Sequence, residues 1–172
     1  MIDLQIASGY TRDKMSEALK GYNNIASEMG RTTTDVLSAA NDWLRAGYDI
    51  ETANKLIRES MKLSTLGMME SAEATKALIS ASKGWKLTAE EVSQVTDELT
   101  ALDMAAATSA GDLATAMAKA NATAALAGAD RQSYEAYLTT VLDVSQQSPE
   151  TAGTAFKTLF ARYSNVKAGK YV

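Results

Sequence analysis

Carboxylates are the main side chains of this sequence that could perform acid–base chemistry, and three pairs of them stand close together. The pairs are Glu70 with Glu73, Glu90 with Glu91, and Asp97 with Glu98. Neighbouring carboxylates can share the roles of acid and base or bind a cation. Each pair, however, falls in the first turn or on the polar face of a predicted helix, where carboxylates complement the helix dipole or meet solvent. We therefore interpret all three pairs as solvated.

The residue types that most often carry catalysis and metal binding are absent from the sequence. The 172 residues include no His and no Cys, which removes the commonest general base, the usual zinc ligands and the thiol nucleophile. The sequence also has no GxxxxGK or GxGxxG phosphate loop and no acidic calcium loop. We assign no catalytic, cofactor-binding or metal-ligating residue, expect no cofactor, and predict that the chain is not an enzyme.

Charge is distributed unevenly along the chain. The formal net charge is -4 and the pI is about 4.9, so the sequence as a whole does not favour specific nucleic-acid binding. After Glu150 no acidic residue follows, and four basic residues accumulate: Lys157, Arg162, Lys167 and Lys170. This basic end either complements a helix dipole and solvent, which we favour, or contacts an acidic surface or nucleic acid.

Two further residue types have both a packing and a binding interpretation. The eight Met residues, including Met68 and Met69, could line an adaptable partner groove, but Met more often fills gaps in a core. Trp43 and Trp85 lie near predicted helical turns, where each could cover the end of a hairpin while its indole N–H stays in contact with water. We favour packing in both cases.

The composition predicts an all-α protein. One Pro, ten Gly and 6% aromatic residues leave few strand-forming clusters and few obstacles to helix. Glycines that suggest helix ends are Gly30, Gly47, Gly67, Gly84 and Gly128. Residues that suggest helix starts are Thr11, Thr34, Asp49, Ser71, Thr88, Ser109, Asp130 and Ser148. The predicted helix start at Thr88 is supported by Glu91, which completes a capping box. The start at Ser148 is supported by Pro149 at the first helical position.

Amphipathic spacing agrees with these helices, and their starts recur at a nearly constant interval. The interval is 37 to 39 residues from Thr34 to Ser148, and 39 to 42 from Asp49 to Asp130. We predict consecutive antiparallel helical hairpins, about seven to eight helices in all, within residues 11–166. They form either a bundle or a short solenoid-like array. Residues 1–10 would be a lead segment. In the last helix, the predicted apolar face is Ala152, Phe156, Leu159, Phe160 and Tyr163.

Neither a secretory signal nor a membrane-spanning segment is expected. The opening residues lack a charged region followed by an apolar one. The longest weakly charged stretch, residues 104–129, contains Asp112 and Lys119 and is mainly Ala, Thr and Gly. We expect a soluble chain, with membrane contact only after rearrangement.

Two stretches in combination carry a family resemblance. Residues 99–117 (LTALDMAAATSAGDLATAM) and 154–170 (TAFKTLFARYSNVKAGK) resemble the core region of tail tape measure proteins of long-tailed phages and prophages. Residues 33–47, 124–128 and 137–144 also fit that family. The resemblance covers most of the chain from about Met15, and none of its motifs is catalytic.

The resemblance implies a structural role in determining tail length and in tail assembly, with release during DNA ejection. It also implies a place in the virion, within the tail lumen, and in the host cytoplasm during assembly. The implied partners are the tail tube protein, tail assembly chaperones and distal tail proteins, with self-association as a further option. Full-length members are much longer, so we expect a fragment in which residues 167–172 are a truncated part of the family core. A helical-repeat adaptor that binds a partner helix or peptide stays as the alternative.

Overall fold

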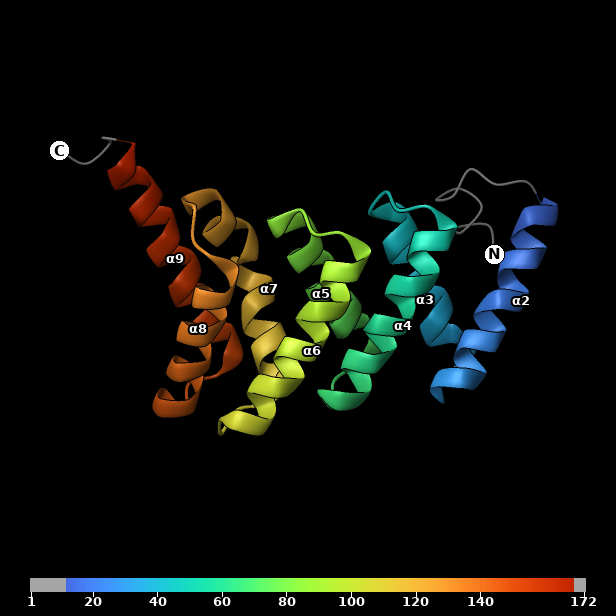
Figure 1. Cartoon of the computed structure of the whole chain (residues 1–172), viewed down its shortest axis with the longest axis horizontal. Coiled ribbons are helices and arrows are strands. Elements are labelled where there is room, and N and C mark those ends of the chain that lie inside the picture. The colour runs from blue at the N-terminus through green and yellow to red at the C-terminus, as the bar shows by residue number, and fades with distance from the viewer. Residues whose placement is uncertain (1–11, 169–172) are drawn as a thin grey trace.

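All regular elements in residues 12–168, which the computed structural model describes, are helices (Figure 1). The eight helices are α2 (Arg12–Met29), α3 (Thr33–Arg45), α4 (Ile50–Leu66), α5 (Ser71–Trp85), α6 (Ala89–Ala105), α7 (Ala110–Ala127), α8 (Arg131–Ser145) and α9 (Pro149–Lys167). The prediction of an all-α chain with about seven to eight helices is confirmed. The predicted helix start at Thr11 and the predicted lead segment 1–10 lie outside the described residues, as does Lys170.

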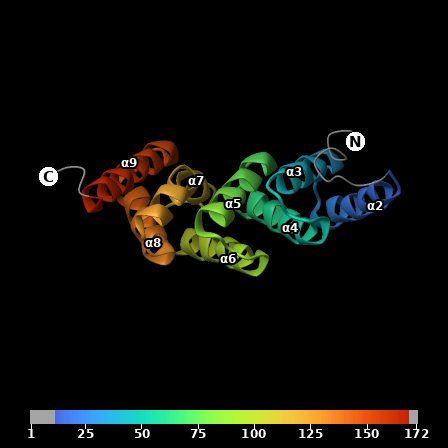
Figure 2. The same ribbon diagram turned by 90° about the horizontal axis from the view of Figure 1, so that it is seen from above.

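The helices form an elongated array of hairpins in two layers. Seen from above, α3, α5, α7 and α9 follow one another in one row, and α2, α4, α6 and α8 in the other (Figure 2). We call these the odd layer and the even layer. Helices of the odd layer begin at residues 33, 71, 110 and 149, and those of the even layer at 12, 50, 89 and 131. The repeat of about 39 residues is therefore one hairpin, and the array, not a closed bundle, is the arrangement observed.

Most helix starts follow from local side-chain chemistry. Asp49, Thr88, Ser109, Asp130 and Ser148 each accept a hydrogen bond from a backbone N–H of the following first turn. The predicted start at Thr34 is wrong, because Thr32 and Asp35 form a reciprocal capping box. The N-cap before Ser71 is Glu70, which makes no side-chain cap bond.

One predicted helix end is also wrong. Gly30, Gly47 and Gly128 follow their helices with positive φ, as expected. Gly84 instead lies inside α5, which ends at Trp85, and the C-cap residue Lys86 adopts the left-handed conformation at φ 58°. A Cβ at Gly84 would lie 3.1 Å from the backbone of Ala122. Gly84 therefore permits close packing of α5 on α7, which a local reading of helix-end signals cannot detect.

Small residues hold the odd layer together. The Ala-rich helix α7 lies between α5 and α9, with Ala110, Ala114, Ala116 and Ala120 all buried. A Cβ at Gly153 of α9 would fall 2.4 Å from the carbonyl oxygen of Ala116. The backbones of α7 and α9 thus approach so closely that only a glycine fits at this point.

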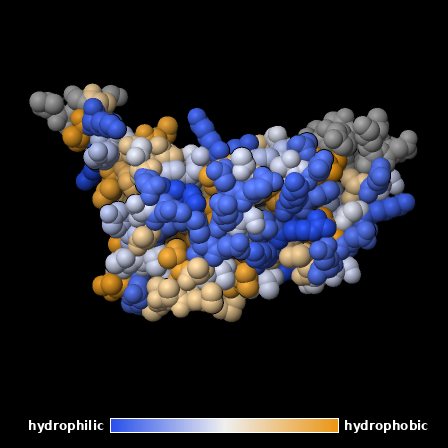
Figure 3. All heavy atoms as spheres, in the orientation of Figure 1, coloured by the Kyte–Doolittle hydropathy of each residue, from blue (hydrophilic) through white to orange (hydrophobic). Residues whose placement is uncertain are grey.

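Ion pairs link the helices of the even layer. Glu28 of α2 meets Arg58 of α4 at 3.0 Å, and Lys62 of α4 meets Asp97 of α6 at 2.6 Å. Glu98 of α6 pairs with Arg131 of α8. The first two pairs are substantially exposed and contribute little to stability, about 0–1 kcal/mol each. The face seen in Figure 3 is mostly hydrophilic over its middle, with apolar residues gathered towards the left end and the lower edge.

Candidate functional site

The three carboxylate pairs singled out in the sequence are not brought together into one site. Glu91 completes the capping box of Thr88, and its neighbour Glu90 lies 3.7 Å from Lys55 of α4. Hydrogen bonds from Thr88 lower the pKa of Glu91. Asp97 and Glu98 pair with two different helices, α4 and α8. These contacts organise the even layer and give the carboxylates structural roles.

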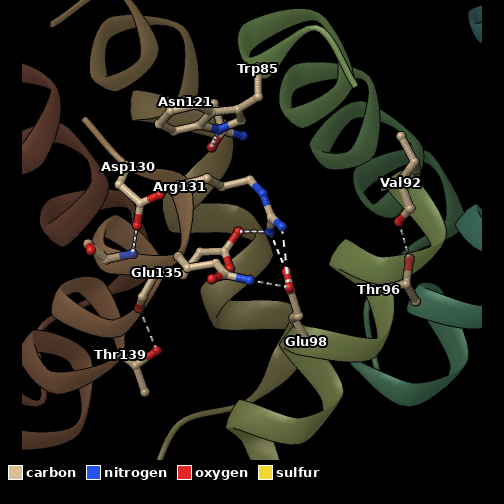
Figure 4. A network of polar contacts seen from close by, with 11 residues as sticks. Trp85, Val92, Thr96, Glu98, Asn121, Asp130, Arg131, Glu135 and Thr139 are labelled. Atoms are coloured by element: carbon tan, nitrogen blue, oxygen red, sulfur yellow. Dashed lines mark hydrogen bonds and ion pairs between the residues drawn. The ribbon is translucent and has the colours of Figure 1, made fainter. Parts of the chain in front are cut away.

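A partly buried charge network joins α6 to α8, and the sequence interpretation missed it. The Arg131 guanidinium donates to both oxygens of Glu98 and to Glu135, the latter at 2.7 Å (Figure 4). Gln132 donates to Glu98 at 3.2 Å. Glu135 is only 3% exposed. The i, i+4 spacing of Arg131 and Glu135 was visible in the sequence, but the partner on α6 is 33 residues away.

Burial and charge shift the pKa values of this network in different directions. Burial raises the pKa of Glu135 to about 7, against the lowering influence of Arg131. For Glu98, burial also favours the neutral form, but hydrogen bonds from Arg131 and Gln132 outweigh it and lower the pKa. The carboxylates of Glu98 and Glu135 share a single cation, the guanidinium of Arg131. The more buried one, Glu135, is therefore the one that holds a proton near neutral pH.

Trp43 and Trp85 are packing residues, as favoured from the sequence, but the indole of Trp43 does not meet water. Trp43 is fully buried, and its Nε1–H donates to Ser60 at 3.0 Å. The Nε1–H of Trp85 donates to Asn121 of α7 at 3.1 Å (Figure 4). Asn121 is fully buried and forms a polar link within the odd layer. The correction has a physical cause, since a buried indole N–H needs a protein partner.

An aromatic cluster connects the last hairpin to the rest of the array. Tyr134 of α8 packs against Trp85, Phe156 and Phe160, with ring centroids 5.6 to 6.2 Å apart. The tyrosine is 1% exposed. Aromatic residues are few in the sequence, yet here they gather at one junction, because α5, α8 and α9 meet there.

The methionines divide between the core and the surface. Met61 and Met117 are buried, in agreement with the core interpretation. Met68 and Met104 are 88% and 81% exposed. Met68 lies in the loop before α5 with φ 48°. It borders a hollow of about 440 Å³ formed where the first turns of α5, α7 and α9 come together. The acidic residues of this hollow are Glu70, Glu73, Asp112 and Glu150.

Helix α9 forms the left end of the array in Figure 1 and carries three of the four basic residues that follow Glu150 in the sequence. Lys157, Arg162 and Lys167 are all exposed. Of its predicted apolar face, Ala152 is buried and Phe156 and Phe160 are half-buried. Leu159 and Tyr163 are exposed, so this part of the apolar face does not pack against the array. The outer side of α9 is thus both apolar and basic.

No group of three or more acidic side chains in the described part of the chain could hold a metal ion. Within that same part, no helix is long and apolar enough to cross a membrane.

A comparison with protein families identifies the family to which this helical array belongs. The family model of the phage-related minor tail protein matches residues 23–171, which is most of the chain. The chain belongs to this family. No solved structure matches it.

As a phage minor tail protein, the chain has a structural role in a phage tail and is associated with the virion. It interacts with other tail components. The matched region includes all of helices α3 to α9 and therefore every contact of the odd layer. In this minor tail protein, the surfaces described above are accordingly candidates for protein–protein contacts.

Proposed function

We propose that this chain is a folded segment of a tail tape measure protein, which contributes to tail length determination and assembly and is released during DNA ejection. The observation that carries this proposal is the hairpin array itself. A continuous helix of 172 residues would extend roughly 260 Å at 1.5 Å per residue. Hairpins of about 39 residues instead return the chain to its starting side, so each one advances the array by about 10 Å. The segment is therefore a folded region of the tape measure and not its straight ruler.

The proposal extends to partners, location and chemistry. The tail tube protein, assembly chaperones and distal tail proteins are the proposed partners, in the tail lumen of the virion and in the host cytoplasm during assembly. We propose no enzymatic activity, since the sequence has no His or Cys. The small-residue contacts of the odd layer suit release through a tube, because Ala and Gly bury little apolar area per helix and leave a modest barrier to unfolding.

Removing one whole hairpin in the phage tests this proposal. Deletion of residues 50–88 joins Asp49 directly to Ala89, so one N-cap residue replaces another and the remaining helices keep their register. A folded segment should give infective particles whose tails are shortened by no more than about 10 Å, measured by electron microscopy. A straight helical ruler should instead shorten the tail by about 59 Å for the 39 residues removed.

A half-repeat deletion provides the matched control. Removing residues 50–70 eliminates α4 alone and exchanges the two layers for every later helix. We expect misassembly and no tails from a folded segment, whereas a ruler would give tails about 32 Å shorter. Proportional shortening in both deletions would therefore overturn the proposal.

A helical-repeat adaptor is the second candidate, favoured by the exposed apolar side of α9. It predicts stoichiometric capture of one partner by the isolated chain, whether or not the deletion of residues 50–88 changes tail length. Binding that persists in a chain unable to support tail assembly would favour the adaptor.

A further inference from the structure

The repeat makes the surface of each odd-layer helix directly comparable with that of the next. Successive helices α5, α7 and α9 begin 39 residues apart, at 71, 110 and 149. By this register Ala77 of α5 corresponds to Ala116 of α7 and Ala155 of α9. Likewise Ala81 corresponds to Ala120 and to Leu159. Positions that meet the following helix in one repeat can therefore be located in the others.

In α5 and α7 these positions are buried, and the following helix of the layer forms part of their surroundings. Ala77 and Ala81 line a narrow space together with residues of α7, among them Ala114 and Met117, and with Val95 and Leu99 of α6. Ala116 lies against Gly153 of α9. All four alanines at the two positions are buried, at 6% exposure or less. One face of each helix is thus used for contact with its successor in the layer.

In α9 the same face is open. Ala155 is exposed, and Leu159, Tyr163 and Val166 are 57%, 56% and 58% exposed. Their spacing of four and three residues places all three on one side of the helix. In the described part of the chain no helix follows α9, which forms the end of the array (Figure 1). Leu159 offers more apolar area than its counterparts Ala81 and Ala120, and Tyr163 and Val166 offer more than their α7 counterparts Ala124 and Ala127.

Charge identifies what kind of helix fits this open face. The basic residues Lys157, Arg162 and Lys167 are exposed on α9, and its single acidic residue, Glu150, lies in the first turn. Arg162 and Lys167 lie three and four residues from Leu159 and Tyr163 and so border this face, whereas Lys157 lies on the opposite side of the helix. Pairing two copies of α9 face to face would bring the bordering cations together and desolvate them. A helix with acidic residues beside its apolar stripe would instead complement them.

The direction of the helix that would bind α9 follows from the direction of the helices in the odd layer. The first turns of α5, α7 and α9 all border the same hollow, so the three helices run parallel. We propose that the outer face of α9, centred on Leu159, Tyr163 and Val166, binds a parallel amphipathic helix with an aliphatic stripe and acidic flanks. That helix takes the place of the next member of the odd layer. The inference depends on the repeat geometry and on the charges of α9, and it stands whether or not the tape measure proposal is correct.

A pair of synthetic peptides tests this inference on the whole chain. Both are helical peptides with the same Leu and Ala stripe, one flanked by Glu and the other by Lys, and binding is followed by fluorescence anisotropy. We expect the Glu peptide to bind at least about tenfold more tightly than the Lys peptide. Arg162→Glu should reverse or abolish that preference.

Matched variants locate the binding face. Leu159→Ser and Tyr163→Ser should each weaken binding of the Glu peptide about tenfold. The control Val144→Ser changes a side chain on α8 that is 76% exposed and should leave binding unchanged. Circular dichroism confirms that each variant keeps its helices, as expected for substitutions of exposed residues.

Orientation can be measured because the sequence contains no Cys. A spin label at Ala155→Cys should broaden signals near the peptide N-terminus, and one at Ala168→Cys those near its C-terminus. The proposal is overturned by equal binding of both peptides, by no binding of either, by an antiparallel pattern, or by equal loss in Val144→Ser. It is also overturned if sedimentation shows a dimer of the chain that Leu159→Ser dissociates, since a second copy would then be the occupant.

Discussion

At the scale of single residues, the contact between α6 and α8 places an unequal number of positive and negative charges in a partly buried site. Arg131 meets two carboxylates, and partial burial of all three groups removes much of the water that would otherwise screen them. With both carboxylates ionised, the three groups carry one uncompensated negative charge. Protonation of Glu135 leaves a neutral set in which Glu98 and Arg131 pair. Removal of one ionised partner is costly in such a site, whereas neutralising the excess charge is not.

This arrangement predicts a fall in stability with rising pH. Burial raises the pKa of Glu135 to about 7 from its ordinary value of 4.5, so between these values the folded chain binds a proton that the unfolded chain has released. The stabilisation is complete below about pH 4.5 and is lost as the pH rises through about 7, by at most about 3 kcal/mol. Urea unfolding followed by circular dichroism at pH 5 to 8 should show this slope.

The substitution Glu135→Gln should remove the slope, because the amide stays neutral throughout the range. Glu17→Gln, at an exposed site on α2, serves as the control and should retain it. An unchanged slope in Glu135→Gln would show that another group takes up the proton.

The sequence predicts residue-level features where the partner is near in the chain. The sequence predicts both Thr88 with Glu91 and Ser148 with Pro149, because the residues that cap a helix lie at most three positions apart in the chain. The contact of Arg131 with Glu98 could not be predicted, since it depends on how α6 and α8 are placed by the array. The same holds for Asn121, whose partner Trp85 is 36 residues away.

At the scale of helices, the two layers are stabilised by different forces. The odd layer depends on close approach of backbones at Gly and Ala, and the even layer on polar contacts between long side chains. The repeat spacing was predictable, because helix starts recur in the sequence. Which helices touch was not, since Gly84 gives the same sequence signal whether it ends a helix or admits a neighbour.

Two Gly→Ala substitutions separate helix propensity from helix packing. In Gly153→Ala the new Cβ would lie 2.4 Å from the Ala116 carbonyl oxygen, so α7 and α9 must move apart. We expect a loss of about 1–3 kcal/mol in the free energy of unfolding, despite the better helix propensity of Ala. At Gly21 in α2 a Cβ meets nothing within 4 Å. Gly21→Ala should therefore gain about 0.5–1 kcal/mol.

Urea denaturation of the two variants beside the parent chain measures both effects. If Gly153→Ala raised the free energy of unfolding as much as Gly21→Ala does, the backbones of α7 and α9 would not approach as closely as described.

At the scale of the whole molecule, a linear array has no single centre. Most of its contacts join neighbouring hairpins, so a local change need not be felt equally along the chain. The two tryptophans report on different parts of it. Trp43 lies in α3 and bonds to Ser60 of α4, whereas Trp85 contacts Asn121 of α7 and Tyr134 of α8.

The last prediction uses these reporters to measure how far destabilisation spreads. We combine Gly153→Ala with either Trp85→Phe, which leaves Trp43 as the fluorophore, or Trp43→Phe, which leaves Trp85. The urea midpoint shift caused by Gly153→Ala should be larger when Trp85 reports, since its hairpins contact α9 directly or through Tyr134. Equal shifts at both reporters would mean that the array unfolds as one cooperative unit. Threading through a tube would then require global unfolding, whereas unequal shifts would allow the hairpins to open in turn from the α9 end.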